Sequence, residues 1–467
     1  MNEINFPKSF IKRMQSHLGN EFELFIEALS HDPEISLRIN PNKNVGQFKD
    51  EEKIPWCETG RYLQSRPEFI FDPLIHAGGY YVQEASSMLF ANAIDFSRDL
   101  RVLDLCASPG GKSTLLLSKL SKSSILFSNE LVNKRADILK ENLVKWGATN
   151  VIVTSNRPAD YNQFYGYFDV VLVDAPCSGE GMFRKNSNAI NEWAENKAFV
   201  CSIGQKDILD EAIKLLKRNG LLIYSTCTYS EEENEQITQW FYHKFHSILN
   251  PVNLEIEPNW GIQEEHVEHF NGKMQSVYKC YPHKIRGEGM FISLFIVNNQ
   301  LHHDITRQRK QQKLFRVLSG SELNQLSSFV ELSEDFTIRK IDEQVYALPV
   351  KYLIEAGLAF TKLNTIKSGT FLGSFNKKNG EFIPSHDLAM SSVIRHDIPF
   401  IELDLKNSLY FLKKNELKIN DLESLPNGWI LARYSGVNLG FLKRTGKRLN
   451  NFYPREWAIR KNLPNWK

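Results

Sequence analysis

The chain has 467 residues, 42% of them hydrophobic and 24% charged, with a formal net charge of +2. This length predicts about three domains, and the composition is that of a soluble globular protein. Six scattered cysteines without a Cys-x-x-Cys pair exclude a disulfide scaffold and a typical zinc site, so we expect no metal. No apolar run approaches the roughly 18 residues of a membrane helix, and the N-terminus has no signal-peptide core. We therefore expect a cytoplasmic protein with no membrane partner.

The first 95 residues are predicted to form an α+β domain. Their apolar residues recur at helical spacing, and Ser36–Asn40 then predicts a short strand that ends at the turn Pro41-Asn42. The apolar residues at helical spacing are Phe10, Met14, Leu18, Phe22, Phe25 and Leu29.

Residues 96–300 alternate strand-like apolar runs with helical stretches, a pattern typical of a doubly wound parallel sheet. The predicted strands are Arg101–Leu105, Ser124–Ser128, Asn150–Thr154, Phe168–Val173 and Gly220–Ser225. The predicted helices between them are Lys112–Leu120, Val132–Trp146 and Lys206–Leu216. We expect an α/β fold with a Rossmann-like sheet, which binds its ligands at the carboxyl ends of the strands.

The last third of the chain changes pattern twice. The polar, basic stretch from His302 to Arg316 predicts a linker, and the segment after it shows no pattern with a recognisable chemistry. Two strands, Trp429–Tyr434 and Val437–Lys443, are joined by Ser435-Gly436 and predict a small β-barrel. The predicted domains are 1–95, 96–300, 301–385 and 386–467.

The C-terminal tail is strongly basic. From Trp429 to Lys467, nine Lys and Arg residues accompany one acid, Glu456, a net charge of +8. Such an excess is typical of a surface that binds a phosphate backbone, although a merely solvated basic surface has the same composition. The predicted RNA contacts are Lys443, Arg444, Lys447 and Arg448 and, after the fourth strand, Arg184 and Lys185.

The segment DLCASPGGKST (Asp104–Thr114) follows the first strand and opens a helix. Its small residues let the backbone approach a ligand, and the helix N-terminus offers free N–H groups. It is not a phosphate-binding P-loop, because Cys106 stands where that motif needs glycine, and the dinucleotide motif Gly-x-Gly-x-x-Gly is absent. Glu130, after the second strand, is placed to bind ribose hydroxyls. These features predict a nucleoside cofactor, and S-adenosylmethionine fits better than a dinucleotide.

Two cysteines follow the fourth and fifth strands, in Asp174-Ala175-Pro176-Cys177 and Thr226-Cys227. Because neighbouring parallel strands end at the same edge of a sheet, both thiols should project into the cofactor crevice. Carbon 5 of cytosine is a poor nucleophile, and a thiolate that adds to carbon 6 raises the electron density on carbon 5. Asp174 is placed to share a proton with the ring nitrogen. The pattern predicts cysteine-dependent methylation of a cytosine.

Other residues near these loops have simpler interpretations. Ser230 and Glu233 predict a capping box for the next helix, so the acidic run 231–233 is assigned to helix structure. The cysteines outside the motifs are expected in the core or at the surface. Tyr80, Tyr81 and Phe183 are candidates for stacking on an unstacked base, with a position in the core as the alternative.

Together these motifs resemble the Sun/Fmu family of RNA 5-methylcytosine methyltransferases. The similar segments are DLCASPGGK, DAPCSGEG, STCTYSEEENE, HAGGYYVQEASSM (His76–Met88) and HKIRGEGMFIS (His283–Ser293). The tail GWILARYSGVNLGFLKRTGKRLNNFYP (Gly428–Pro454) is similar to the ribosomal RNA branch of the RsmF type. The resemblance covers essentially the whole chain. It implies a class I S-adenosylmethionine methyltransferase sheet, an N-terminal substrate domain and a C-terminal PUA-like barrel that binds RNA.

The resemblance also implies roles for single residues. Cys227 is the implied nucleophile, and Cys177 is implied to assist breakdown of the covalent intermediate. Asp174 is implied to contact the cofactor and the base edge. Asn156 is assigned to the adenine, at a position where the family often has an acid. The residues implied to hold the methionine and ribose parts are Cys106, Ala107, Ser108, Pro109, Gly110, Gly111, Lys112 and Glu130.

We expect a monomer that methylates carbon 5 of a cytosine in 16S ribosomal RNA, either as free RNA or within the small subunit. A transfer RNA substrate is the nearest alternative. An RNA-binding ribosome-assembly factor without catalysis is the alternative from another class, and the retention of both cysteines argues against it. Methylation of an exocyclic amino group is disfavoured, because no Asn/Asp-Pro-Pro-Tyr motif follows the fourth strand.

Overall fold

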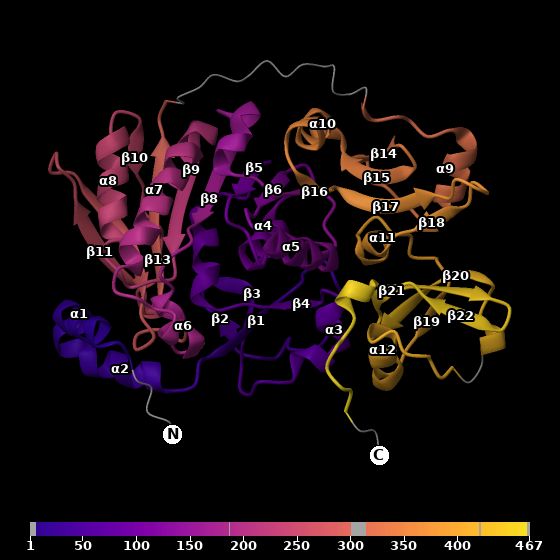
Figure 1. The fold of residues 1–467 in the computed structure, drawn as a ribbon, viewed down its shortest axis with the longest axis horizontal. Helices are drawn as coiled ribbons and strands as arrows, with labels where there is room; N and C mark the ends of the chain where they lie inside the picture. The colour runs from indigo at the N-terminus through magenta and orange to yellow at the C-terminus, as the bar shows by residue number, and fades with distance from the viewer. Residues whose placement is uncertain (1–5, 186, 300–313, 420–421, 465–467) are drawn as a thin grey trace.

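A large mixed sheet lies at the centre of the molecule, with smaller sheets below it and to one side (Figure 1). The computed structural model describes residues 6–185, 187–299, 314–419 and 422–464. The predicted linker between His302 and Arg316 lies almost entirely outside these residues. Within the described ranges, no helix is both long enough and apolar enough to cross a membrane.

The N-terminal part consists of helices and a four-stranded antiparallel sheet. Its helices are α1 (Lys8–Leu18) and α2 (Phe22–Ser30), followed later by α3 (Pro73–His76). The sheet order is β2 (Lys53–Ile54), β3 (Cys57–Leu63), β1 (Ile35–Ile39) and β4 (Tyr80–Val82). Of the apolar residues predicted at helical spacing, all except the partly buried Leu18 are buried, because α1 and α2 pack this stripe against the catalytic part of the chain.

The central sheet has five parallel strands with antiparallel strands on both sides. Its parallel strands, in spatial order, are β9 (Leu216–Thr226), β8 (Phe168–Asp174), β5 (Arg101–Asp104), β6 (Ile125–Asn129) and β7 (Val151–Thr154). Its antiparallel strands include β13 (Met290–Val297) beside β9 and β16 (Thr365–Ser368) beside β7. Outward from β13 follow β12 (Met274–Cys280) and β11 (Gln263–Glu268), and β10 (Leu249–Pro251) also pairs with β13. The five predicted strands coincide with the five parallel ones.

Helices cover both faces of this sheet (Figure 1). They are α4 (Gly111–Lys119) and α5 (Asn133–Trp146) on one face and α7 (Lys197–Leu215) and α8 (Glu235–Phe245) on the other, with α6 (Ser187–Asn191) before α7. Successive strand residues alternate between two cores: Val102 packs with α4 and α5, whereas Leu103 packs with α7 and α8. Because both faces are buried, the parallel strands are continuous apolar runs. These continuous apolar runs are the reason that the sequence predicted the strands.

The intermediate region combines a separate sheet with one strand of the central sheet. Its own sheet contains β14 (Phe336–Ile341), β15 (Gln344–Pro349), β17 (Thr370–Phe375) and β18 (Phe382–Pro384). Its helices are α9 (Gly320–Ser327), α10 (Leu353–Lys362) and α11 (His386–Met390). Between α10 and β17, the chain forms β16, which pairs with β7 through Thr365 and Thr154. This region is therefore hydrogen-bonded directly to the edge of the catalytic sheet.

The C-terminal part is a four-stranded sheet with one helix. The strands are β19 (Phe400–Glu402), β20 (Gly428–Tyr434), β21 (Val437–Thr445) and β22 (Arg448–Asn451), in that order, and the helix is α12 (Leu405–Leu412). Ser435 and Gly436 join β20 to β21 with φ angles of 49° and 76°. Two adjacent residues with positive φ are the signature of a tight hairpin turn, as the sequence predicted.

Candidate active site

The carboxyl ends of four parallel strands form one rim, and the predicted chemical residues lie along it. β5 ends at Asp104, β6 at Asn129, β8 at Asp174 and β9 at Thr226. Because β8 and β9 are parallel neighbours, with Asp174 opposite Ser225, the loops that follow them meet. Loops at the ends of adjacent parallel strands form the usual ligand crevice of such sheets.

The two predicted cysteines are in contact. The Sγ atoms of Cys177 and Cys227 lie 3.3 Å apart, and both thiols are free. The pKa of the Cys177 thiol is raised well above its ordinary value, first by the hydrogen bond to Cys227 and then by burial. Cys177 therefore keeps its proton, in contact with the sulfur of Cys227.

Asp174 forms an ion pair beside these thiols. Its Oδ2 accepts a bond from Lys112 Nζ at 2.7 Å, and its Oδ1 accepts one from Ser225 Oγ at 2.8 Å. Burial lowers the pKa of Lys112, but the Asp174 carboxylate outweighs burial and the Cys227 thiol adds to the effect, so the pKa is raised. Lys112 therefore stays protonated and places a positive charge near the Asp174 carboxylate and the Cys227 sulfur. The sequence placed Lys112 in the cofactor loop and did not show that it pairs with Asp174.

The loop before α4 is held from several sides. Gly110 caps the helix with φ +113°, a conformation that other residues rarely adopt. Arg38 of β1 is fully buried and donates to the Gly111 carbonyl at 3.1 Å and to Thr114 Oγ1 at 2.6 Å. Asn142 Nδ2 donates to the Pro109 carbonyl at 2.8 Å. The loop shape therefore depends on the N-terminal sheet and on α5, and nothing in the local sequence pointed to Arg38.

Two carboxylates lie beneath this loop. Asp104 is fully buried; its Oδ2 accepts from Ser113 Oγ at 2.6 Å, and burial raises its pKa to about 7. Glu130 accepts from the Val132 N–H at 3.0 Å through Oε1, and its Oε2 lies 3.3 Å from Arg135. Glu130 was predicted as a ligand contact. Asp104 was not, although an acid at the end of the first strand was a visible signal.

Asn156 lies next to a residue of the intermediate region. Its Oδ1 accepts a bond from the Asn364 N–H at 3.0 Å, and its own N–H donates to Asn129 Oδ1 at 3.0 Å. The Ser155 N–H also donates to the Asn364 carbonyl at 2.9 Å. The contact of Asn156 with an adenine stays a prediction. Asn364, from the segment for which the sequence showed no chemistry, reaches the predicted adenine end of the site.

Arg184, predicted to contact RNA phosphate, is instead part of the protein framework. Its side chain is 5% exposed and binds Glu288 through Nε and Nη2, with Nη2–Oε1 at 2.9 Å. Nη2 also donates to the Gly287 carbonyl at 2.8 Å. A buried guanidinium that neutralises a buried carboxylate is not available to phosphate, so this prediction is wrong. Lys185 is partly exposed, 3.9 Å from Glu288, and its RNA contact stays a prediction.

Two of the three candidate stacking residues belong to the core. Phe183 is 1% exposed and packs edge-on against Phe10 with ring centroids 5.0 Å apart. Tyr80 is also 1% exposed, and its hydroxyl donates to Asp72 at 2.8 Å. Tyr81 is partly buried beside Gly111. The core alternative is therefore correct for Phe183 and Tyr80.

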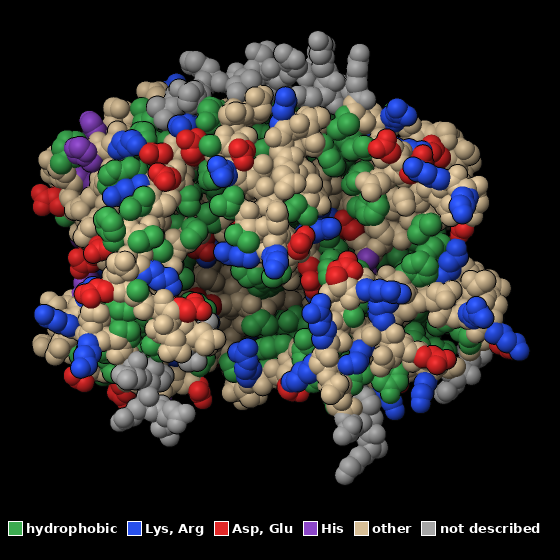
Figure 2. Space-filling model, viewed as in Figure 1, with side chains coloured by type: hydrophobic (Ala, Val, Ile, Leu, Met, Phe, Trp, Pro, Cys, Tyr) green, Lys and Arg blue, Asp and Glu red, His purple; other side chains and the backbone are tan. Residues whose placement is uncertain are grey.

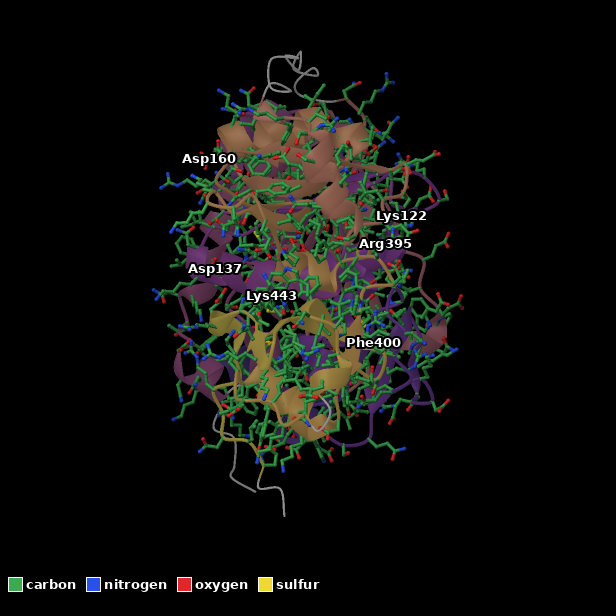
Figure 3. All side chains as sticks on the ribbon, turned by 90° about the vertical axis from the view of Figure 1, so that its right-hand side faces the viewer. Lys122, Asp137, Asp160, Arg395, Phe400 and Lys443 are labelled. Atoms are coloured by element: carbon green, nitrogen blue, oxygen red, sulfur yellow. The ribbon has the colours of Figure 1, made fainter. Side chains whose placement is uncertain are left out.

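The predicted RNA contacts of the C-terminal sheet differ in availability. Lys443 lies 2.5 Å from Glu381 and 4.9 Å from the centre of the Trp429 ring, and Figure 3 shows it on the opposite side of this region from Phe400. Arg444 donates to the carbonyls of Leu425 and Gly446. Lys447 and Arg448 are exposed, and within the described residues no ion pair engages them. Lys and Arg side chains are numerous on this part of the surface (Figure 2).

The predicted capping box is absent. α8 begins at Glu235 after Asn234, and no side chain caps it. Glu233 is instead fully buried and accepts a bond from the Ser178 N–H at 2.8 Å. The capping prediction is wrong because a neighbouring loop, invisible in the local sequence, supplies the partners of this carboxylate.

Family models match three successive parts of the chain. The model described as 16S rRNA methyltransferase RsmB/F matches residues 91–296. The N-terminal domain of 16S rRNA methyltransferase RsmF matches residues 6–85, and the methyltransferase RsmF PUA domain matches residues 399–459. The chain belongs to the RsmB/F family of methyltransferases.

Relatives of this RsmB/F-family protein match it along its whole length. Ribosomal RNA small subunit methyltransferase F of Psychromonas ingrahamii is 27% identical over 490 aligned positions, which cover 99% of each chain. The protein of the same name from Aliivibrio fischeri is 28% identical over 492 positions, again 99% of each chain. The crystal structure of a methyltransferase homolog protein from Pyrococcus horikoshii superposes with a TM-score of 0.53, at 24% identity over 63% of this chain and 96% of that one. That structural likeness shows the fold.

As a member of this family, the protein takes its methyl group from S-adenosylmethionine. The residues at the rim fit such a group. Asp104 Oδ1 is buried and has no hydrogen-bond partner within the described residues, which suits it to the cationic methionine part. At Gly111, the position of a Cβ would be in ordinary van der Waals contact, at 3.4 Å, with the side chains of Tyr81 and Gln83.

Proposed function

We propose that this RsmB/F-family methyltransferase methylates carbon 5 of a cytosine in 16S ribosomal RNA through a covalent cysteine–cytosine adduct. The observation that carries the proposal is the contact of two free thiols, 3.3 Å apart, beside the Asp174–Lys112 pair. A single nucleophile would suffice to form an adduct. A second thiol in contact with the first suits a reaction in which the first thiol must also leave.

Cys227 is the proposed nucleophile. Its thiol proton passes through Asp174 to the ring nitrogen as its sulfur forms a bond to carbon 6, and the electron pair of the 5,6 double bond becomes available at carbon 5. Asp174 shares a proton with the ring nitrogen, and Lys112, hydrogen-bonded to Asp174, offsets the negative charge. S-adenosylmethionine, when bound, supplies an electrophilic methyl group. Before that transfer, the protein's own residues form the bond to carbon 6, orient the ring and hold its charge.

Cys177 is proposed to act in release. The carbon 5 proton must leave, the 5,6 double bond must re-form, and the electron pair of the carbon 6–sulfur bond must return to Cys227. Cys177 relays the proton: it accepts the one from carbon 5 and gives its own to the sulfur of Cys227, which it already contacts. The ring nitrogen then loses the proton that it gained, through Asp174 to solvent, so one proton is released for each methyl group transferred and both thiols end as they began.

The substrate and setting are proposed from the relatives and the surface. The matched relatives are named ribosomal RNA small subunit methyltransferase F, which supports RNA of the small subunit as substrate. We propose that residues 1–95 and 386–467 contact this RNA around the catalytic part, with Lys447 and Arg448 as phosphate contacts. We also propose that the protein works as a monomer in the cytoplasm, where its substrate is assembled.

The test uses small subunits and ribosomal RNA from cells that lack this protein, with labelled S-adenosylmethionine. The wild type should form 5-methylcytosine, Cys227→Ala should form none, and Cys177→Ala should accumulate a protein–RNA adduct that survives denaturation. Cys57→Ala, which removes a buried thiol of β3, is the matched control. Labelling of transfer RNA instead would reject the ribosomal substrate. Tight RNA binding without labelling in any form would reject catalysis.

A further inference from the structure

Two buried carboxylates next to the cysteines take no part in the proposed chemistry. Glu180 follows Cys177 by three residues, Glu233 follows Cys227 by six, and both are 0% exposed. Burying a carboxylate is unfavourable unless hydrogen bonds compensate it. Most hydrogen-bond partners of the two carboxylates lie outside the carboxylate's own loop. Glu180 has a partner in the Cys227 loop, and Glu233 has one in the Cys177 loop.

Glu233 holds the loop of Cys177. Its Oε1 accepts from the Ser178 N–H at 2.8 Å and from Gln205 Nε2 at 3.1 Å, and its Oε2 accepts from Ser178 Oγ. Ser178 Oγ also lies 2.8 Å from Thr228 Oγ1. The residue after Cys177 is thus bonded both to Glu233 and to the residue after Cys227.

Glu180 makes the reverse connection. Its Oε2 accepts from the Tyr229 N–H at 3.3 Å, within the Cys227 loop. Its Oε1 accepts from Arg13 Nη2 at 2.6 Å and from Trp193 Nε1 at 3.0 Å. Next to it, the Gly181 N–H donates to the Cys227 carbonyl at 2.9 Å. The Cys177 loop therefore grips the backbone on both sides of Thr228.

The helix α7 ties this arrangement to the sheet. Gln205 Nε2 also donates to the Pro176 carbonyl at 3.0 Å, and Tyr224 of β9 donates through its hydroxyl to the Glu233 carbonyl at 2.6 Å. Gln205 and Tyr224 are themselves buried. The loops are therefore fixed to α7 and β9 as well as to each other, which limits how far the two sulfurs can separate.

We propose that Glu180 and Glu233 form a reciprocal clamp, a pair of positioning residues that holds the two cysteine loops as one unit and keeps the two sulfurs in contact. The catalytic consequence, fast release of the product by Cys177, rests on the proposed function. The geometric consequence does not, because the proximity of two thiols can be measured without RNA.

The geometric test uses phenylarsine oxide, which binds two neighbouring thiols. Two arsenic–sulfur bonds form, and the arsenic-bound oxygen leaves as water with both thiol protons. We expect the wild type to bind this probe through Cys177 and Cys227, and Cys177→Ala to lose that binding. Glu233→Gln and Ser178→Ala should each bind it at least about tenfold more weakly, because their loops separate more easily. Glu232→Gln, which changes the exposed neighbouring carboxylate, is the matched control.

Unchanged binding of the arsenical by both Glu233→Gln and Ser178→Ala would overturn the clamp, whatever happens to RNA. Binding of S-adenosylmethionine and the thermal unfolding midpoint identify a variant that has lost its fold. Glu233→Gln is the more disruptive change, since it removes a buried charge. Ser178→Ala removes only one hydroxyl, so at least one of the two variants is expected to stay folded.

The catalytic test follows the covalent adduct over time. Glu233→Gln should release product about 10- to 100-fold more slowly than wild type, the cost of a small misplacement of a reacting group. It should therefore accumulate adduct as Cys177→Ala does, with the KM for S-adenosylmethionine unchanged. Release at the wild-type rate would contradict the role in catalysis. If the wild type forms no 5-methylcytosine, the proposed function fails, and the arsenical result still decides whether the clamp exists.

Discussion

The active-site rim and the C-terminal sheet both carry charged residues that the sequence assigned to function, but these residues are engaged differently. At the rim, Asp174, Lys112 and the two thiols face one another. In the C-terminal sheet, Lys443 and Arg444 are already bonded to Glu381 and to backbone carbonyls. A motif at the end of a strand predicts the position of its side chains, because the sheet fixes the positions of the strand ends. The net charge of a segment does not predict which of its Lys and Arg side chains are free to bind RNA.

Arg184 shows this difference most clearly, because it lies near the rim but forms a buried ion pair with Glu288. Arg184→Ala leaves Glu288 buried without its partner, and we expect a loss of about 3–5 kcal/mol in the free energy of unfolding. Urea unfolding measures it. Lys185→Ala, the more exposed neighbour, should change this value by less than about 1 kcal/mol. An Arg184→Ala protein of normal stability that binds RNA more weakly would restore the phosphate contact and weaken the distinction.

Lys112→Met tests whether the cation at the rim acts in the reaction. It removes the hydrogen bond to Asp174 and the charge beside Cys227, so kcat should fall by about 100- to 1,000-fold, the usual cost of losing one preorganised donor. Lys119→Met, which changes an exposed lysine of the same helix, should retain the wild-type rate. A raised KM for S-adenosylmethionine with an unchanged kcat would show that Lys112 only holds the cofactor.

Asp104 links the rim to pH. Burial raises its pKa to about 7, so the free protein is about one-tenth ionised there at pH 6 and about nine-tenths ionised at pH 8. Because a cationic ligand favours the carboxylate, the affinity for S-adenosylmethionine should rise about tenfold between these values. Isothermal titration of wild type and Asp104→Asn at each pH separates this effect from the titration of the ligand itself. Parallel pH profiles for the two proteins would reject the contact.

The same carboxyl affects stability. Its folded pKa lies above its ordinary value, so its favourable contribution is complete below about pH 4 and is lost as the pH rises through 7. Asp104→Asn should therefore gain stability relative to wild type over this range in the absence of ligand. Thermal unfolding at pH 5 and pH 8 measures the difference, and a constant difference would contradict the buried titration.

The smallest expected effect concerns the C-terminal sheet. Substitution of both Lys447 and Arg448 by Ala should lower the slope of log affinity against log salt by about two, one for each phosphate contact. Lys443→Ala should leave the slope nearly unchanged, because Glu381 already neutralises that lysine. Filter binding of the RNA at several salt concentrations checks both. Equal effects of the two changes would mean that RNA displaces Glu381.

Much of the fold could be predicted because it depends on local pattern. The five parallel strands are apolar runs buried on both faces. Of the helices between them, α4 and α5 have nearly the predicted bounds, whereas α7 begins at Lys197, well before the predicted Lys206. The hairpin at Ser435-Gly436 follows from two residues that accept positive φ. The meeting of Cys177 and Cys227 also followed, because β8 and β9 had to be neighbours for both loops to end at one rim.

What could not be predicted depends on partners distant in the chain. Glu233 had the spacing of a helix cap, but the Ser178 N–H, 55 residues away, takes its carboxylate. Arg38 binds the loop before α4 from 73 residues away, and Arg184 meets Glu288 across 104. Asn364 reaches Asn156 only because β16 joins the edge of the central sheet. Contacts between residues so far apart in the sequence produce no periodic pattern that sequence reasoning could detect.

The sequence by itself determined the α/β sheet, the loop that begins α4, the pair of cysteine motifs and the basic character of the tail. Each of these features depends on residues that are close together in the chain. Only the tertiary structure decided which charged groups are free to act. A buried charge has to find a partner wherever the fold supplies one, and that partner consumes its capacity to bind anything else. Asp174 is paired with Lys112 but keeps 32% of its side chain exposed at the rim, whereas Arg184, Glu180 and Glu233 are buried with their partners inside the protein.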